Sequence, residues 1–280
     1  MTVGLWEAII LGIVEGITEF LPVSSTGHLT ITEKLLGLKV DDVAVTAYTA
    51  IIQVGAMAAA IIYFWRDIVR IVVALARGLV SREARRGPDW SLSLAVVVGS
   101  LPIGVVGLAA KGVIEGPLRS LWFVVGGLVV WSAVMVLAER IATQKRGEND
   151  VRLTDGVLIG LSQCIALVPG VSRSGATISA GLMLGIDRVT ATRLSFFLGI
   201  PALTAAGILE AVTVRDEIGS RVGWTATVVG TVVSFIVAYA SIAWLLRYVA
   251  RHSIVTFVWY RVAVGGLLAG ALALGWLSAT

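Results

Sequence analysis

The stretch EGITEFLPVSSTGH, residues 15–28, places two carboxylates, four hydroxyls and a histidine inside an apolar segment that runs from Val3 to Leu38. A second polar stretch, PGVSRSG at residues 169–175, interrupts the apolar segment Thr154–Gly185 in the same way. Irregular backbone at membrane depth is tolerated only where it is buried in protein or lines a water-filled cavity. We therefore predict two re-entrant hairpins, residues 3–38 and 154–185, whose half-helices enter and leave the membrane on one side.

The chain as a whole has the composition of a membrane protein. Of 280 residues 57% are hydrophobic and 14% are charged, whereas a soluble domain has about 25% charged residues. Apolar stretches of roughly 20 residues, the length that crosses a bilayer core, predict an all-α integral membrane protein with six spanning helices. The predicted spans are Ala44–Phe64, Ser91–Ala110, Leu121–Arg140, Ala191–Val212, Trp224–Leu246 and Phe257–Trp276.

The two hairpins are related by an internal repeat. A constant offset of 148 residues pairs Gly12 with Gly160, Glu15 with Gln163, Val23 with Val171, Ser24 with Ser172, Thr26 with Ser174, Gly27 with Gly175, Leu36 with Leu184 and Gly37 with Gly185. Each half, residues 1–140 and 150–280, holds one hairpin and three spans. Because three is odd, the second half must insert upside down, which predicts an inverted-topology repeat folded as one integrated membrane domain with a site where the broken helices meet.

The distribution of basic residues predicts an orientation. Fifteen lysines and arginines, Arg261 among them, fall on one predicted face, and six fall on the other: Lys34, Lys39, Lys111, Arg119, Arg215 and Arg221. The richer face is predicted to be cytoplasmic, so both termini and the mouth of the first hairpin face outward. Basic residues placed in short loops by topology do not indicate nucleic-acid binding, and the chain has no basic or aromatic reading module. The single cysteine, Cys164, excludes an internal disulfide and a cysteine metal cluster.

The carboxylates of the first hairpin suggest a metal site. Glu15 and Glu19 are four residues apart, so on a helix they project from one face and repel each other. Charges in an apolar setting are costly unless they are paired. A divalent cation would remove both penalties, and hard oxygen ligands favour Mg²⁺ or Ca²⁺. The alternative is a pair of carboxylates hydrogen-bonded to neighbouring hydroxyls.

The hydroxyls and the histidine suggest nucleophilic chemistry. Ser24, Ser25, Thr26 and His28 follow within one turn, and a hydroxyl three residues from an imidazole can reach it, as in a nucleophile with its general base. For this loop alone, the favoured interpretation is that the hydroxyls are helix caps and that His28 is a buried, satisfied histidine.

The second hairpin contributes a cation. Arg173 is flanked by hydroxyls and Gly175, and its fork of donors matches phosphate oxygens, with the N-terminus of the next half-helix nearby. The alternative is a structural arginine paired with Glu15 or Glu19. Carboxylates, hydroxyls, histidine, arginine and helix N-termini together predict metal-assisted phosphoryl transfer.

These motifs resemble a known family. The string EGITEFLPVSSTGH at 15–28 and QCIALVPGVSRSGAT at 163–177 are similar to the motifs of undecaprenyl-diphosphate phosphatase, the bacitracin-resistance family, and the resemblance covers essentially the whole chain. It implies a metal-dependent hydrolase of the plasma membrane that converts undecaprenyl diphosphate to the monophosphate lipid carrier for cell-wall synthesis, with a multi-pass chain and a site facing outward. It also implies Glu15 and Glu19 at the metal, Arg173 on the diphosphate, and Ser25 with His28 as the catalytic pair.

Within that implied site we favour Ser25 as nucleophile and His28 as base, with direct attack by His28 as the alternative. Further candidates for contacts to phosphate are Ser24, Thr26, Gln163, Ser172, Ser174 and Thr177. The rival function is a polyprenyl-phosphate transporter or flippase, because inverted repeats with broken helices are typical of transporters. Transport would need neither Ser25 nor His28. The sequence leaves open whether two copies form a homodimer.

Overall fold

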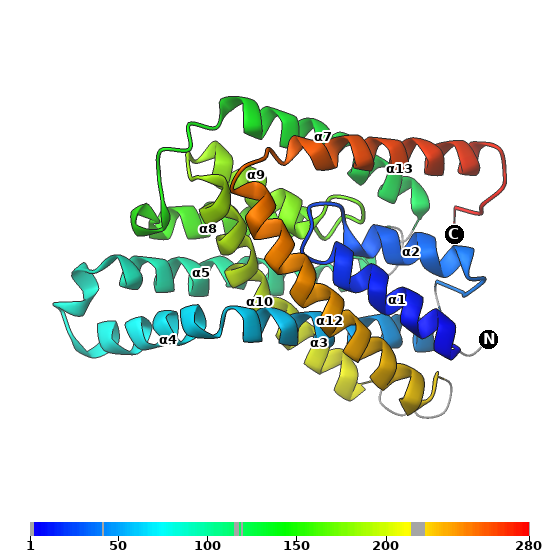
Figure 1. Cartoon of the computed structure of the whole chain (residues 1–280), viewed down its shortest axis with the longest axis horizontal. Helices are drawn as coiled ribbons and strands as arrows, with labels where there is room; N and C mark the ends of the chain where they lie inside the picture. Colours follow the sequence, from blue (N-terminus) through cyan, green and yellow to red (C-terminus); the bar gives the residue numbers. More distant parts are fainter. Residues whose placement is uncertain (1–2, 41, 115–117, 119, 214–221, 280) are drawn as a thin grey trace.

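The computed structural model describes residues 3–40, 42–114, 118, 120–213 and 222–279, and their regular secondary structure is helical. Six helices are long and apolar enough to cross a membrane, which confirms the six predicted spans with ends shifted by a few residues. They are α3 (Val43–Tyr63), α5 (Pro88–Ala109), α7 (Leu121–Ile141), α10 (Arg188–Thr213), α12 (Trp224–Val249) and α13 (Val255–Ala273). In Figure 1, α7 and α13 lie side by side along one edge of the molecule.

Two helix–loop–helix segments replace spans in the two interrupted regions. The first consists of α1 (Leu5–Thr18) and α2 (Ser25–Leu35), and the second of α8 (Leu153–Ile165) and α9 (Arg173–Met183). Residues 19–24 form the first loop and residues 166–172 the second. Each loop ends on a serine with a left-handed backbone, φ 78° at Ser24 and 77° at Ser172, a conformation that is strained for a residue with a side chain. These serines are 148 residues apart, so the sequence offset marks a shared backbone path.

One helix was not predicted. After Phe64 the chain continues as α4 (Trp65–Val80), which packs beside α5 and projects with it from the bundle (Figure 1). Its apolar residues alternate with arginines and Asp67, so the stretch looks like a charged loop in the sequence. Three short helical turns complete the described elements: Ala84–Arg86, α6 (Lys111–Ile114) and Glu148–Asp150.

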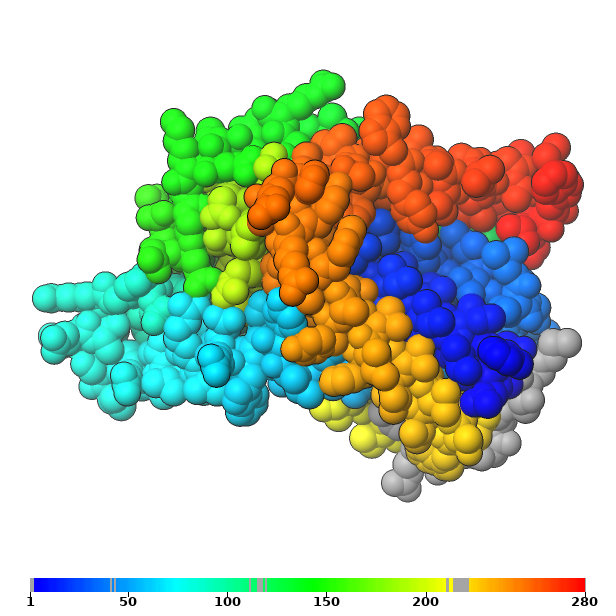
Figure 2. All heavy atoms as spheres, viewed as in Figure 1, coloured from blue at the N-terminus to red at the C-terminus, as the bar shows by residue number. Residues whose placement is uncertain are grey.

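The two halves of the chain are interleaved through glycine-mediated helix contacts. Helix α1 packs on α12 of the second half, and α8 packs on α5 of the first half; Figure 2 shows α12 crossing this face of the molecule between α1 and the α3–α4 region. A Cβ added to Gly12 would lie 2.6 Å from the carbonyl oxygen of Gly230, and one added to Gly160 would lie 2.3 Å from that of Gly99. Small residues let membrane helices approach this closely, and the approach brings both loops to the centre of the bundle.

An aromatic cluster and a network of ion pairs connect the first loop and α4 to α10. Phe20 of the first loop packs edge-on against Phe196, with ring centroids 5.2 Å apart. One turn away on α10, Arg193 donates to Asp67 of α4 over 2.7 Å and to Glu148 over 2.9 Å. These contacts tie α4, α10 and the segment before α8 together on the side of the molecule that carries most of the arginines.

Candidate active site

A cavity of about 380 Å³ lies where the two loops meet α3 and α10, a size in the range of roughly 300–1,000 Å³ that is usual for small-molecule sites. Its polar wall is made by Glu15, Glu19, Ser24, Ser25, Thr26, Gln53, Ser172 and Arg173. The rest of the lining mixes the polar side chains of Thr30, Glu33, Thr46 and Thr49 with apolar ones, among them Ala50, Ile103, Leu167 and Leu203. The cavity therefore offers both charged groups and apolar surface, as a head group with a hydrocarbon tail requires.

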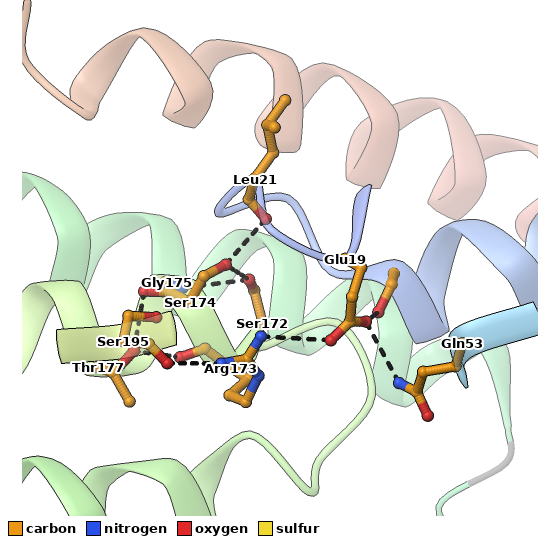
Figure 3. Close-up of polar contacts among 10 residues, drawn as sticks. Glu19, Leu21, Gln53, Ser172, Arg173, Ser174, Gly175, Thr177 and Ser195 are labelled. Atoms are coloured by element: carbon orange, nitrogen blue, oxygen red, sulfur yellow. Dashed lines mark hydrogen bonds and ion pairs between the residues drawn. The ribbon is translucent and has the colours of Figure 1, made fainter. Parts of the chain in front are cut away.

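Glu19 is the centre of the polar wall. Its Oε2 accepts a hydrogen bond of 2.6 Å from the hydroxyl of Ser25 and one of 3.4 Å from the amide of Gln53. Its Oε1 accepts from Nη2 of Arg173 over 3.3 Å (Figure 3). A single carboxylate thus holds the hydroxyl of the first residue of α2 and the guanidinium of the first residue of α9.

Arg173 is held against the backbone of α10. Its Nη1 donates to the carbonyl oxygen of Ser195 over 2.7 Å (Figure 3). A Cβ added to Gly199 would lie 1.9 Å from Nη1, so the guanidinium occupies the space that this glycine leaves open. The sequence did not indicate Gln53, Ser195 or Gly199, because each lies within an apolar stretch that reads only as a span.

Glu15 is a buried carboxyl group without a hydrogen-bond partner among the described residues. The side chain is 1% exposed, and neither carboxylate oxygen accepts a hydrogen bond from any residue that the structure describes. The nearby hydroxyl of Thr18 donates to the carbonyl of Val14 instead. The alternative in which neighbouring hydroxyls satisfy the acid pair therefore applies to Glu19, which holds Ser25, and not to Glu15. A buried carboxylate without a donor, one helical turn from a second carboxylate, fits a hard divalent cation.

Among the described residues, the acids that line this cavity are Glu15, Glu19 and Glu33. Within the described residues there is no group of three or more histidine, cysteine or acid side chains that could hold a metal ion. Mg²⁺ commonly uses one or two protein carboxylates and completes its shell with water and substrate phosphates, so the donor set of Glu15 and Glu19 remains compatible with that ion. Gln163, the counterpart of Glu15 in the repeat, donates to the carbonyl of Gly99 over 3.1 Å and serves helix packing.

The structure does not bring Ser25 and His28 together. Nδ1 of His28 lies 2.8 Å from the carbonyl oxygen of Ser24, and Nε2 lies 2.8 Å from the hydroxyl of Tyr260. The hydroxyl of Ser25 points to Glu19 instead. The predicted pair is not formed here, and the hydroxyl of Ser25 is hydrogen-bonded to the carboxylate of Glu19.

The other predicted hydroxyls mainly hold the two loops together. Ser24 Oγ accepts from the backbone N–H of Gly170 over 3.1 Å, and Ser174 Oγ donates to the carbonyl of Leu21 over 2.9 Å. Ser24 also caps α2, as the capping alternative for the first loop predicted, and Ser172 caps α9 in the same way. Thr177 bonds the backbone of its own helix. Of these residues, Ser24, Thr26 and Ser172 line the cavity.

Comparison with known proteins identifies the family. Residues 8–267 match the family model described as "Bacitracin resistance protein BacA". The chain belongs to this family. It is 57% identical to undecaprenyl-diphosphatase 3 of Frankia casuarinae over 98% of this chain and 99% of that protein. It is 58% identical to the undecaprenyl-diphosphatase of Acidothermus cellulolyticus, over 96% of this chain and 97% of the relative, and 55% identical to undecaprenyl-diphosphatase 1 of Streptomyces avermitilis, over 99% of both.

In this member of the bacitracin-resistance family, a buried arginine fixes both loops. Arg261 of α13 is 0% exposed; its Nη1 donates to the carbonyl of Pro22 over 3.0 Å, and its Nη2 to those of Gly170 and Val171 over 2.9 and 3.1 Å. Further bonds reach the carbonyl of Gly127 and the hydroxyl of Ser132. The guanidinium thus satisfies carbonyls that the broken helices leave without helical partners.

The position of Arg261 corrects the count of basic residues on which the predicted orientation rests. It was counted among fifteen basic residues on the cytoplasmic face, but it lies inside the bundle. Its removal leaves fourteen on that face against six on the other, so the predicted direction is unchanged. Of those six, Arg119, Arg215 and Arg221 lie outside the described residues.

Proposed function

We propose that the protein is a membrane hydrolase that removes the terminal phosphate of undecaprenyl diphosphate and yields the monophosphate lipid carrier used in cell-wall synthesis. The observation that carries the proposal is the contact of Glu19 with both Ser25 and Arg173 inside a cavity that polar and apolar side chains line together. This arrangement places a nucleophile, a proton acceptor and a phosphate-binding cation within one site. The undecaprenyl-diphosphatases that are more than half identical to this chain support the choice of substrate.

The geometry supports a two-step reaction. In the first step Ser25 Oγ attacks the terminal phosphorus while Glu19 takes the hydroxyl proton, and the bond from that phosphorus to the bridging oxygen breaks. The lipid monophosphate leaves, and a phosphoserine remains. In the second step water attacks the phosphoserine phosphorus, inorganic phosphate leaves, and Glu19 returns its proton to the oxygen of Ser25. Arg173 binds the phosphate oxygens and balances their charge in both steps.

The proposed metal ligands are Glu15 and Glu19. Bound Mg²⁺ or Ca²⁺ would neutralise charge on the diphosphate. The unpaired oxygens of Glu15 support this assignment. The expected result is that EDTA abolishes phosphate release by the purified protein and that added Mg²⁺ or Ca²⁺ restores it. Full activity in EDTA would contradict a role for the ion.

Hydrolysis is favoured over lipid transport by the direction of the Ser25 hydroxyl. A transport site for a lipid phosphate would use Arg173, but it has no need for a hydroxyl whose oxygen lies 2.6 Å from the carboxylate oxygen to which it donates. Ser25→Ala should abolish phosphate release and retain binding of the lipid diphosphate. Ser162→Ala is the matched control, because the hydroxyl of Ser162 bonds a backbone carbonyl of its own helix, α8. If Ser25→Ala releases phosphate like this control, the proposed nucleophile is wrong.

We also propose that the two helix–loop–helix segments are re-entrant and that residues 1–140 and 150–280 form an inverted repeat within one membrane domain. Matching backbone angles at Ser24 and Ser172 and the reciprocal packing of α1 and α8 support this. The first segment and both termini would face outward, and the second would enter from the cytoplasm. In a Cys164→Ser background, a cysteine near Lys39 should react with an impermeant reagent outside the cell. A cysteine near Arg85 should react only after permeabilisation, and the reverse pattern would overturn this orientation.

A further inference from the structure

A tyrosine of α13 contacts His28 on the side of α2 that faces away from the cavity. The cavity is lined from α2 by Ser25, Thr26 and Leu29, with Thr30 and Glu33 one turn further on. On the opposite side of the helix, the rings of His28 and Tyr260 stack with centroids 5.5 Å apart and planes within 11°. The hydroxyl of Tyr260 lies 2.8 Å from Nε2 of His28. His28 is thus held by a residue that lies outside the polar wall of the cavity.

The partners of His28 determine its tautomer. Nδ1 faces the carbonyl oxygen of Ser24 at 2.8 Å. A carbonyl oxygen only accepts hydrogen bonds, so this contact is a hydrogen bond only in the tautomer in which Nδ1 carries the proton. In the neutral imidazole Nε2 is then an acceptor, and the hydroxyl of Tyr260 is the donor that satisfies it.

The tautomer fixes the turn that precedes the proposed nucleophile. The carbonyl of Ser24 accepts both from Nδ1 of His28 and, over 3.2 Å, from the backbone N–H of the same residue. Ser24 has a left-handed backbone, φ 78°, and its Oγ binds the N–H of Gly170 in the other loop. Ser25 follows at once, with its hydroxyl on Glu19. Rotation of the Ser24 peptide would therefore move the hydroxyl of Ser25.

The second loop shows that a serine can adopt this backbone conformation without the contact of a histidine and a tyrosine. Ser172 has the same backbone conformation, φ 77°, and caps its helix through the N–H of Gly175 in the same way. The offset of 148 places Ala176 where the first loop has His28. The histidine–tyrosine support is thus present at the loop that carries Ser25 and absent from this position of its counterpart.

We propose that Tyr260 is a positioning residue: its hydroxyl holds His28 in the Nδ1–H tautomer, and through the Ser24 carbonyl it holds Ser25 against Glu19. The proposal rests on the proposed hydrolase function for its effect on rate, but its structural part is measurable without any activity. Tyr260 is not among the residues that line the cavity, and it acts through His28.

The test is nitrogen NMR on protein labelled with ¹⁵N-histidine. The chain has two histidines, so His252→Gln, at an exposed position, leaves His28 as the only signal. This variant should show a single Nδ1–H tautomer. Tyr260→Phe keeps the ring and removes the hydroxyl, and it should give a mixture of tautomers. Tyr239→Phe is the control, since that exposed tyrosine of α12 packs its ring against Tyr63; it should leave the spectrum unchanged.

The kinetic readout is the turnover number. Tyr260→Phe should lower kcat by about two- to tenfold, the effect of one net hydrogen bond, and leave KM for the lipid diphosphate unchanged. In a His28→Asn background the asparagine amide still reaches the Ser24 carbonyl but makes no bond to Tyr260. There Tyr260→Phe should have no effect on kcat, as a double-mutant cycle requires for residues that act together.

Three results would overturn the proposal: an Nε2–H tautomer in the wild type, an unchanged spectrum in Tyr260→Phe, or an equal loss of kcat from Tyr260→Phe with and without His28. If the wild type fails to release phosphate but the tautomer shifts as expected, the proposed hydrolysis fails while the Tyr260–His28–Ser24 contact stands. If Tyr260→Phe does not fold, Tyr260→Leu replaces it in both measurements, since leucine also lacks the hydroxyl. An unchanged tautomer and an unchanged kcat in that variant would then overturn the proposal.

Discussion

Replacing Gly199 by alanine would place a methyl carbon 1.9 Å from Nη1 and 2.5 Å from Cζ of Arg173. Ordinary contact begins at about 3.4 Å, so the guanidinium has to move by about 1.5 Å. The move breaks the 2.7 Å bond to the carbonyl of Ser195 and the 3.3 Å bond to Glu19. Hydrogen bonds to charged groups contribute about 1.5–3 kcal/mol each, and a misplacement of about 1 Å can cost about 100-fold in rate. We therefore expect kcat/KM to fall by roughly 10²- to 10³-fold.

The same substitution should spare the fold. Arg173 yields at the end of a flexible side chain, and alanine has a better helix propensity than glycine by about 1 kcal/mol. Gly104→Ala on α5 is the control, because its Cβ meets no atom within 4 Å; it should keep full activity. The assay is phosphate release from a polyprenyl diphosphate by purified protein, with thermal unfolding in detergent measured beside it. A Gly199→Ala variant with near-wild-type kcat/KM would show that the position of Arg173 does not control the reaction.

Three further perturbations test the supports of the site. Arg261→Lys replaces a fork of donors by a single ammonium. Thermal unfolding in detergent should therefore show a lower Tm, and the rate of phosphate release should fall by at least about tenfold. An unchanged Tm would mean that the two loops are stable without the hydrogen bonds of Arg261. His28→Asn should retain more phosphate release than His28→Gln, whereas a base or nucleophile at His28 would make both lose about 10²- to 10⁴-fold. Burial would raise the pKa of Glu148, but the hydrogen bond from Arg70 and the charges of Arg193 and Arg70 outweigh it and hold this pKa below its ordinary value. The carboxylate therefore stabilises the fold above its unfolded pKa of about 4.3 and loses that effect as the pH falls through the lower folded pKa. The Tm of the wild type should fall more than that of Glu148→Gln between about pH 6 and about pH 3. Parallel plots of Tm against pH for the two proteins would contradict this.

Hydropathy and the internal repeat predicted the spans and the two loops because both are local properties of the sequence. Apolar runs of bilayer length are unambiguous, and the loops carry polar residues that the bilayer does not tolerate without cover. Helix α4 was not predicted because the charged residues Arg66, Asp67 and Arg70 make this amphipathic helix look like a loop in the sequence. Arg261 was assigned to the surface for a related reason: it lies in the second turn of α13, and sequence distance from a helix end does not give depth in the bundle.

The site was predicted in part, and the misses have one cause. Glu15, Glu19, Ser25 and Arg173 come together because they sit on or beside the loops, which the sequence marks. The partners of these residues on the spanning helices could not be read, since Gln53, Ser195 and Gly199 act through tertiary contacts. The neighbour of His28 was misassigned for the same reason. Tyr260 follows it by 232 residues, and no local spacing records that contact.

The most direct test of the central claim is a single-turnover experiment with lipid diphosphate labelled with ³²P on its terminal phosphate. The reaction is quenched with acid on the millisecond timescale, and the labelled peptide is mapped. Attack by Ser25 with Glu19 as base predicts acid-stable phosphoserine on the peptide that contains Ser25, and none in Ser25→Ala. Acid-labile label on His28, or rapid release of phosphate without any labelled protein, would contradict it.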